Sequence, residues 1–526
     1  MGDSLQSTRY NAAEDLIERN LKAGRGRKIA YVDEAGSYSY SELAERVNRC
    51  ANALLREGIR PGERIVSCLL DTIDFPACFL GAIKAGIMPI PINTFFQAGD
   101  YAYILRDSQP KAIVVSESLL PRIAEAMRIS GWSAQIFVSG KSTSEFPALS
   151  DLMKSASAAA KTAPTQADDV CFWLYSSGST GEPKGAVHRH ASLVRTAELF
   201  GQEVLGIQEN DIAYSAAKLF FAYGLGNALS FPLSVGATAI LYSGRAQAKV
   251  VCEILRKNKP TIFCGVPTLF SSLLVSEDLP KREELSLRLC TSAGEALPED
   301  VGRRWTDRTG VEIVDGIGST EMLHIFISNR PGSCLYGTTG TPVPGYKVRL
   351  LDENGQEVPP GEMGDLHVSG PSAAAYYWNK PEKTASTFLG EWVKTGDRFR
   401  QDAKGNYVYC GRSDEMLKVS GLWVSPMEVE SALISHEAVL EAAVVGALDE
   451  NKLVKPKAYV VVKPGVAQGP ALAVELKDFV KNRLAPHKYP RWIEFLDELP
   501  KTATGKIRRN VLRASANEAN KDFRGA

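Results

Sequence analysis

One short run of residues constrains this chain more than any other. Segment 175–185, YSSGSTGEPKG, follows the apolar run VCFWLY directly, which predicts a buried strand ending in a loop of serine, threonine and glycine. Such a loop offers backbone N–H groups and hydroxyls, and Lys184 adds a positive charge, so the segment can hold a polyphosphate. A Walker A motif requires GxxxxGK[ST]; here glycine follows the lysine, which excludes a P-loop phosphotransferase.

Strand and helix patterns alternate on both sides of this loop. Apolar runs such as RIVSCLL and KAIVVS alternate with segments of helical spacing, one of which begins with the capping-box residues Ser39 and Glu42. Alternation of this kind predicts parallel sheets. Residues 331–370, rich in glycine and proline, predict short antiparallel strands. We therefore expect an α/β chain with a large N-terminal domain, 1–412, that contains two parallel-sheet subdomains and a smaller β subdomain, followed by a small mobile α+β domain, 413–526.

Charge and cysteine content exclude several classes of function. Lys plus Arg and Asp plus Glu are balanced at 61 each, which gives no general attraction to nucleic acid or anionic membranes. No apolar segment is long enough to span a bilayer, and the first residues do not resemble a signal peptide. The nine cysteines are scattered singly without CxxC spacing, which disfavours a zinc cluster or a disulfide framework and favours the cytoplasm.

Four further sets of motifs follow the loop. They are SAGEAL (292–297), DGIGSTEM (315–322), TGD (395–397) with YCGRSDEMLKVSG (409–421), and LPKTATGKIRR (499–509). Each also has a purely structural interpretation. SAGEAL alone fits an ordinary strand-to-helix turn, a surface Asp or Arg is usually a solvated charge, and an exposed basic tail explains the charge of the last run but not its PKTxxGK pattern.

With these motifs in this order, the chain resembles the adenylate-forming superfamily of acyl-CoA synthetases, peptide-synthetase adenylation domains and luciferases. The resemblance extends along essentially the whole chain. It implies an acid:CoA ligase that first forms an acyl-adenylate and pyrophosphate from a carboxylate and ATP, and then transfers the acyl group to coenzyme A. ATP, Mg²⁺ and coenzyme A are the implied cofactor and cosubstrates.

The resemblance also implies the roles of individual residues. Thr180, Glu321, Lys418 and Lys506 would be catalytic, with Glu321 the Mg²⁺ ligand and Lys506 the adenylation lysine. The implied nucleotide-binding residues are Ser176, Ser177, Gly178, Ser179, Gly181, Lys184, Gly294, Glu295, Ala296, Asp315, Gly316, Ile317, Ser319, Thr320, Asp397 and Arg412. Ile317 departs from the family, which often has an aromatic residue stacked on adenine at this position.

The second half-reaction would use the small domain. By resemblance, Asp414 is the hinge about which this domain rotates, and rotation exchanges Lys506 for Lys418 at the active site. Ser420, Gly421 and Trp423 would then line the pantetheine tunnel.

The acid would be bound by a compact pocket. The implied substrate residues are Phe221, Ala222, Tyr223, Ala293, Gly318, Leu323, His324 and Ile325. Aromatic and aliphatic walls with one polar group, His324, suit a small aromatic acid, and this combination resembles the benzoate–CoA ligase branch, with a role in aromatic acid degradation. An aromatic stripe is also typical of plain core, and a single histidine is often structural, as we interpret His188 and His190.

Other functions stay open at this point. A short or medium-chain aliphatic acid would fit if Tyr223 moved aside, and an adenylation enzyme could load a carrier protein, although no carrier domain follows. An amino-acid substrate is disfavoured because residues 218–233 contain no aspartate to bind an α-ammonium group. A non-enzymatic homologue is disfavoured because Lys184, Glu321 and Lys506 are all present. The oligomeric state is open, with a homodimer as one option.

Overall fold

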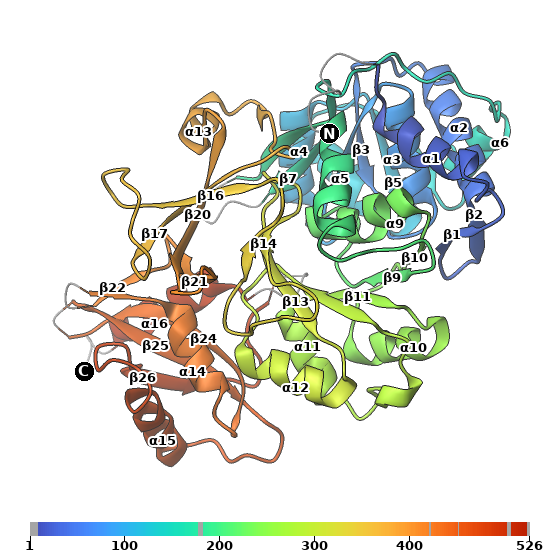
Figure 1. The fold of residues 1–526 in the computed structure, drawn as a ribbon. Coiled ribbons are helices and arrows are strands. Elements are labelled where there is room, and N and C mark those ends of the chain that lie inside the picture. The colour runs from blue at the N-terminus through green and yellow to red at the C-terminus, as the bar shows by residue number, and fades with distance from the viewer. Residues whose placement is uncertain (1–8, 177–181, 420–421, 451, 502–506, 523–526) are drawn as a thin grey trace.

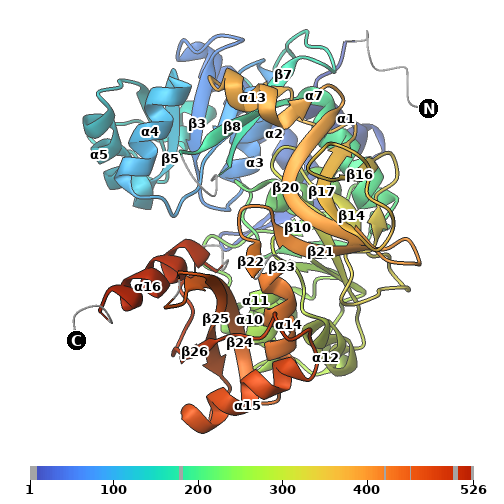
Figure 2. The same cartoon turned by 90° about the vertical axis from the view of Figure 1, so that its left-hand side faces the viewer.

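The structure is a computed structural model that describes residues 9–176, 182–419, 422–450, 452–501 and 507–522 (Figure 1). Two largely parallel sheets form most of the large body, an antiparallel sheet lies beside them, and a small α+β unit packs below (Figures 1 and 2). The α/β architecture predicted from the sequence is confirmed. The domain boundary at residue 412 remains a prediction.

The first parallel sheet has four strands. In spatial order they are β4 (Met88–Pro91), β3 (Arg64–Cys68), β5 (Ala112–Ser116) and β6 (Gln135–Ser139). The helices of this region are α1 (Ala12–Lys22), α2 (Tyr40–Arg56), α3 (Asp74–Lys84), α4 (Ala98–Ser108), α5 (Leu120–Ser130) and α6 (Leu149–Lys154). The predicted capping box begins α2: Ser39 N–H donates to the Glu42 carboxylate at 2.7 Å, and Glu42 N–H donates to Ser39 Oγ at 3.3 Å.

The second sheet has nine strands, with parallel pairing from β13 through to β1. In spatial order they are β15 (Thr341–Pro342), β14 (Ile325–Ser328), β13 (Ile313–Gly318), β12 (Leu289–Ser292), β11 (Ile262–Gly265), β9 (Ile212–Ser215), β10 (Thr238–Ile240), β1 (Ile29–Val32) and β2 (Ser37–Ser39). Its helices include α8 (Ala222–Leu225), the π-helix η3 (Gly226–Ser230), α9 (Phe231–Val235), α10 (Ala248–Asn258), α11 (Pro267–Leu274) and α12 (Glu299–Thr309).

Two antiparallel sheets complete the large body. The first is β7 (Val170–Ser176), β8 (Lys184–Arg189) and β18 (Tyr376–Tyr377), and it is followed in the chain by α7 (His190–Thr196) and the π-helix η2 (Ala197–Gln202). The second consists of β16 (Lys347–Leu351), β17 (Met363–Ser369), β19 (Phe388–Leu389), β20 (Trp392–Gln401) and β21 (Tyr407–Arg412), with α13 (Pro381–Thr387) preceding β19. Its strands β16 and β17 lie within residues 331–370, where the sequence predicted short antiparallel strands of a small β subdomain, but the sheet extends to residue 412.

The C-terminal unit is built on a three-stranded sheet. Its elements are the hairpin β22 (Leu417–Val419) and β23 (Leu422–Val424), then α14 (Pro426–Ile434), β24 (Val439–Leu448), β25 (Val454–Val462), α15 (Pro470–Lys481), β26 (Trp492–Phe495) and α16 (Arg509–Asp522). A small cleft lined from α11, from residues 295–298 and from α14 separates this unit from the large body.

Two hydrophobic cores meet at the segment that contains α8. Leu219, Phe220 and Leu225 belong to the core of the N-terminal helices, whereas Phe231 belongs to the core beneath the β subdomain. Phe221 and Ala222 pack on the first core and Tyr223 on the second. The stretch predicted to bind the acid therefore lies at the junction of two subdomains.

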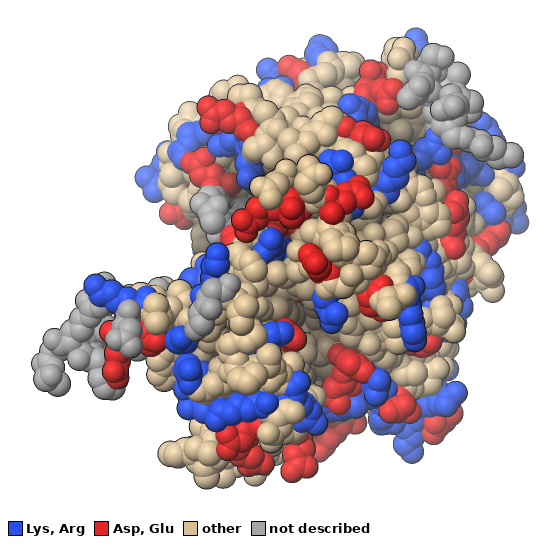
Figure 3. All heavy atoms as spheres, turned by 60° about the vertical axis from the view of Figure 1, so that its left-hand side comes forward, with Lys and Arg blue, Asp and Glu red and all other residues tan. Residues whose placement is uncertain are grey.

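Charged groups of both signs are spread over the surface. On the face shown in Figure 3, lysine and arginine alternate with aspartate and glutamate over both the large body and the small unit. This distribution agrees with the balanced charge of the sequence. Within the described part of the chain, no helix has the length and apolar character that crossing a bilayer requires.

Candidate active site

The motifs converge at one edge of the second sheet. β12 ends at Ser292, where SAGEAL begins, and β13 ends at Gly318 within DGIGSTEM. These strands are parallel neighbours, with Ser292 opposite Asp315, so both motifs follow at the same carboxyl edge. In open α/β sheets this edge is where ligands bind.

Glu321 is the centre of the arrangement. The Tyr377 hydroxyl donates to Glu321 Oε1 at 2.7 Å, and Ser176 Oγ donates to the same oxygen at 3.4 Å. Ser176 is the last residue of β7, and Tyr377 lies on β18, two strands away in the same sheet. A short antiparallel sheet thus brings Ser176, at the start of the predicted phosphate loop, to the predicted metal ligand.

Lys184 lies on the same sheet, opposite Ser176. Its ammonium is 4.8 Å from the centre of the Tyr377 ring, a cation–π contact. Burial lowers the pKa of Lys184, and the charge of Glu321 opposes that shift. The Lys184 ammonium, the Tyr377 ring and the Glu321 carboxylate therefore interact with one another beside Ser176.

The turn that carries Thr320 and Glu321 is tightly fixed. His188 Nε2 lies 2.8 Å from the Thr320 carbonyl oxygen, and Ala374 N–H donates to the Glu321 carbonyl at 2.7 Å. Burial lowers the pKa of His188 to about 4, so the ring is neutral and Nε2–H is the donor. Leu323 follows in a left-handed conformation, φ 63°, which is strained for a leucine. The turn is therefore held in a conformation that the local sequence alone would not favour.

His190, the other histidine interpreted as structural, has a comparable environment. Its Nδ1 accepts a hydrogen bond from Ala12 N–H at 3.2 Å, and burial lowers its pKa to about 4. The neutral ring joins α7 to the start of α1.

Asp397 and Arg412 are paired across β20 and β21. Arg412 donates to Asp397 Oδ1 at 3.2 Å and to the Thr395 carbonyl at 3.1 Å. Burial raises the pKa of Asp397, and Arg412 opposes the shift. The predicted hinge, Asp414, lies 3.6 Å from Arg412 Nε, so this residue and the arginine predicted to lie near the ribose form an ion pair.

Of the side chains predicted to bind the acid, His324 and Tyr223 are in contact, and two phenylalanines that were not predicted join them. The His324 ring packs against Tyr223, Phe231 and Phe200, with centroid distances of 5.5, 4.5 and 5.2 Å. Nε2 lies 3.2 Å from the Tyr223 carbonyl oxygen, and burial lowers the pKa of His324 to about 3. The ring is neutral, Nε2–H donates to that carbonyl, and Nδ1 is an acceptor that has no partner within the described residues.

Two features fix the shape of this region. The Tyr223 hydroxyl is hydrogen-bonded to Thr291 Oγ1 at 2.5 Å. A side chain at Gly226 would meet His324 Cδ2 at 2.4 Å, so only glycine allows this approach. Ala293, Leu323 and Ile325 are buried nearby, as expected for a compact apolar wall.

The remaining nucleotide-binding predictions lie along the same edge. Gly294 adopts φ 95°, which forms the turn before Glu295 and Ala296. Gly316, Ile317 and Gly318 belong to the end of β13, and Ser319 Oγ accepts from Met322 N–H at 3.2 Å. Burial raises the pKa of Asp315, whose Oδ1 is buried.

The residues predicted for the thiol-transfer step are separate from this cluster. Lys418 is exposed on β22, and its ammonium lies 5.4 Å from the ring of Trp423, its partner on β23. Arg398 packs on the same indole at 5.0 Å. Eight predicted site residues lie outside the described part of the chain: Ser177, Gly178, Ser179, Thr180, Gly181, Ser420, Gly421 and Lys506.

The sequence interpretation did not single out Tyr377 or Thr291. Tyr377 is separated from Glu321 by 56 positions and reaches it only because β18 pairs with β8. Thr291 precedes the SAGEAL motif and resembles any residue of a buried strand. No local pattern marks either residue.

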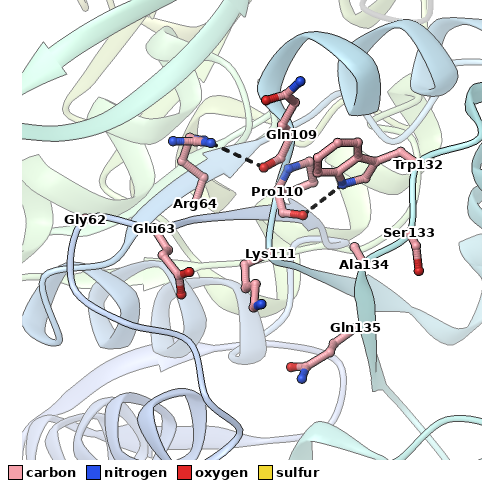
Figure 4. A pocket seen from close by; sticks show the side chains of 10 residues that line it. All are labelled: Gly62, Glu63, Arg64, Gln109, Pro110, Lys111, Trp132, Ser133, Ala134 and Gln135. Atoms are coloured by element: carbon pink, nitrogen blue, oxygen red, sulfur yellow. Dashed lines mark hydrogen bonds between the residues drawn. The ribbon is translucent and has the colours of Figure 1, made fainter.

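A surface cleft of about 370 Å³ lies elsewhere, at the amino ends of β3, β5 and β6 (Figure 4). Arg64 Nε donates to the Ser108 carbonyl at 2.8 Å, and Trp132 Nε1 donates to the Pro110 carbonyl at 3.0 Å (Figure 4 shows the second contact). Two polar groups that line the cleft are therefore already hydrogen-bonded to the backbone. Its position at the opposite edge of the sheet from the carboxyl ends disfavours it as the active site.

The chain matches the family model described as AMP-binding enzyme over residues 17–378, and the model described as AMP-binding enzyme C-terminal domain over residues 428–506. It therefore belongs to the AMP-binding enzyme family, and the resemblance predicted from the motifs is confirmed.

Individual relatives are similar along nearly their whole length. A benzoate–CoA ligase of Thauera aromatica is 59% identical over 509 residues, which cover 96% of each chain. The crystal structure of a benzoate CoA ligase from Burkholderia xenovorans LB400 superimposes with a TM-score of 0.91 at 53% identity, covering 96% of this chain and 100% of that one. An anthranilate CoA ligase in complex with anthranoyl-AMP gives a TM-score of 0.94 at 41% identity, covering 99% of this chain and 100% of that one.

Proposed function

We propose that this protein is an AMP-forming acid:CoA ligase whose acid is benzoate or a small substituted benzoate. A single observation carries the chemistry: Ser176 and Tyr377 donate to Glu321 near the carboxyl edge of the second sheet, and the Lys184 ammonium lies over the Tyr377 ring. Whole-length similarity to benzoate–CoA ligases supports the acid, as does the aromatic environment of His324.

The first step needs positioning and charge relief rather than a base. A carboxylic acid is already ionised at neutral pH and attacks the α-phosphorus directly, so a general base is unnecessary. The obstacle is repulsion between the carboxylate and the triphosphate. We propose that Lys184 and the hydroxyls of the 176–184 loop bind the phosphates, that Asp397 and Arg412 hold the ribose, and that Lys506 stabilises the charge as pyrophosphate leaves.

The residues at Glu321 fit Mg²⁺. Carboxylate and hydroxyl oxygens are hard donors, and Mg²⁺ in nucleotide sites is usually bound by one or two carboxylates together with substrate phosphates. Glu321, oriented by the Tyr377 hydroxyl, would hold the ion with the triphosphate, where it neutralises phosphate charge.

The second step transfers the acyl group to the thiol of coenzyme A and releases AMP. We propose that the domains 1–412 and 413–526 rotate about Asp414, so that Lys418, Ser420, Gly421 and Trp423 approach the adenylate. The acyl-adenylate is a mixed anhydride that water would hydrolyse, so it must stay enclosed until the thiol arrives.

The acid is proposed to lie against Tyr223 and His324. A neutral His324 whose Nε2–H is already donated offers no positive charge, so the carboxylate is expected to face the nucleotide and the aromatic ring to face the apolar wall. Tyr223, fixed by Thr291, limits the length of the pocket. Degradation of aromatic acids is the proposed context.

Two finer points accompany this proposal. We propose a cytoplasmic location, which fits the nine cysteines, all of which are free. A homodimer is retained as the proposed assembly, to be tested by light scattering on the purified protein.

A substrate panel tests the function. Purified protein with Mg-ATP and coenzyme A would be given benzoate, 2-aminobenzoate, 4-hydroxybenzoate, phenylacetate, hexanoate and amino acids, with AMP and acyl-CoA mass as readouts. Fastest AMP and aryl-CoA formation with benzoate or a small derivative supports the proposal. A CoA ester formed only from hexanoate would refute the aromatic acid, ADP as product would refute the mechanism, and adenylate without CoA ester would point to a carrier protein.

A further inference from the structure

One hydrogen bond ties the small unit to the predicted adenine turn. Ile507 N–H donates to Glu295 Oε1 at 2.9 Å. Glu295 belongs to SAGEAL in the large body, and Ile507 directly follows Lys506 in the chain. The contact is therefore made by the residue that follows the predicted adenylation lysine in the sequence.

Ile507 is itself firmly attached to the small unit. It forms an isolated antiparallel bridge with Lys501, and Arg508 N–H donates to the Pro500 carbonyl at 2.7 Å. Lys501 is ion-paired with Glu441 of β24 at 2.6 Å. The two ends of segment 501–507 are thus joined to each other and to the central sheet of the unit.

Arg509 extends this attachment into the interior. It donates to Glu430 Oε2 on α14 at 2.7 Å, and Glu430 Oε1 accepts from Val444 N–H of β24 at 2.7 Å. The Glu430 side chain is 3% exposed, so the ion pair is buried. The segment that contains Ile507 is therefore firmly bonded to α14 and β24 of the small unit.

The surroundings of the Glu295 contact suit a separable interface. The cleft of about 50 Å³ beside it is lined by Pro267 and Pro298 from the large body and by Met427 and Leu440 from the small unit. The same cleft is lined by Glu430, Glu441 and Arg509, so close apolar packing does not fill this interface, whereas a hydrogen bond to a carboxylate is strong and directional. The Glu295 contact is thus well suited to define one orientation of the small unit.

We propose that the Glu295 side chain is a positioning residue that holds the small unit in the orientation used for adenylation. This inference rests on the proposed function. It differs from the sequence-based role of Glu295, in which the backbone of the turn holds adenine. In the same arrangement Lys418 lies exposed on β22. The Glu295 contact must therefore break when the small unit rotates to bring Lys418 to the active site for thiol transfer.

The two half-reactions can be measured separately to test this proposal. Pyrophosphate release in a single turnover with benzoate and ATP reports adenylation, and benzoyl-CoA formation from supplied benzoyl-AMP reports thiol transfer. Glu295→Ala is expected to slow adenylation about tenfold, the usual effect of losing a charge-assisted hydrogen bond, and to leave thiol transfer within about twofold. Glu295→Gln, which keeps an oxygen acceptor, is expected to recover most of the adenylation rate.

Matched variants keep the test decisive. Glu299→Ala removes a carboxylate of α12 that pairs with Arg303 within the helix, and it should leave both steps unchanged. If Glu295→Ala lowers the thermal midpoint, Glu295→Asp replaces it, since its shorter side chain cannot reach Ile507 N–H. Equal losses in both half-reactions would show a damaged adenine turn, and no loss in either would also overturn the inference. A wild-type protein that adenylates no acid would instead refute the proposed function.

Discussion

Replacing Tyr377 with phenylalanine should uncouple Glu321 from the sheet of β7, β8 and β18 without disturbing the packing there. The hydroxyl donates to Glu321 Oε1 at 2.7 Å, and the Tyr377 side chain is buried, at 3% exposed. Phenylalanine keeps the ring over which the Lys184 ammonium lies, so the cation–π contact survives. The substitution removes one hydrogen bond and little else.

The size of the effect follows from the charge on the acceptor. A hydrogen bond to an ionised group contributes about 1.5 to 3 kcal/mol, and each 1.4 kcal/mol is about tenfold in rate. Because water cannot easily replace a donor in a buried position, we expect kcat/KM for adenylation to fall by about 10- to 150-fold. Half-saturation should also require more Mg²⁺, since an unoriented Glu321 binds the ion less well.

Pyrophosphate release measured over a range of Mg²⁺ concentrations checks both expectations. Tyr376→Phe is the matched control, because this tyrosine is the neighbouring residue of β18 and is 36% exposed. If Tyr377→Phe and Tyr376→Phe gave the same rates and the same Mg²⁺ dependence, the bond between Tyr377 and Glu321 would have no part in catalysis.

Three further predictions follow from other contacts. Asp397→Asn should raise the KM for ATP about tenfold or more and leave the KM for benzoate unchanged, because it weakens the charge-assisted hydrogen bonds proposed between Asp397 and the ribose. Steady-state kinetics with each substrate varied would show this, and equal changes in both constants would contradict it. Gly226→Ala should lower thermal stability and kcat/KM for benzoate, since the new Cβ would meet His324 Cδ2 at 2.4 Å, whereas Gly99→Ala, with open space around it, should change neither. Burial lowers the pKa of His190 to about 4, so stability from this group is complete above about pH 6.5 and decreases as the pH falls toward 4. At pH 5.5, His190→Asn should therefore take up about one proton fewer on unfolding than wild type, with no difference at pH 8; calorimetry in buffers of different ionisation enthalpy measures this, and an equal uptake at pH 5.5 would refute it.

Local chemistry allowed much of the molecule to be predicted. The alternation of strands and helices predicted the parallel sheets, and the capping box at Ser39 and Glu42 is present in the structure. Asp397 and Arg412 were both assigned to nucleotide binding on the resemblance of their motifs, and the structure places them next to each other as an ion pair. Polar and charged residues that are clustered in motifs in a fixed order can be recognised from the sequence, because folding alone rarely requires such clusters.

Residues that depend on tertiary pairing could not be predicted in this way. Tyr377 and Thr291 contribute through contacts made by neighbouring strands, and nothing within a few positions of either residue indicates this. The π-helix η3 interrupts the stretch predicted to bind the acid, although the sequence there is typical of an ordinary helix or core segment. The left-handed backbone conformation of Leu323 could not be predicted either, because the surrounding fold imposes this strain and leucine has no preference for it.

The position of residues 221–223 between two hydrophobic cores bears on how such an enzyme can change its substrate. Phe221 and Ala222 pack on one core and Tyr223 on the other, so a change of size at Phe221 alters the packing of the first core and a change at Tyr223 that of the second. Substitutions in this stretch that would admit a bulkier acid are therefore expected also to weaken the packing between the two subdomains. Paired substitutions, one in each core, are the expected route, and a bound acid that fills the junction would itself compensate for part of the lost packing.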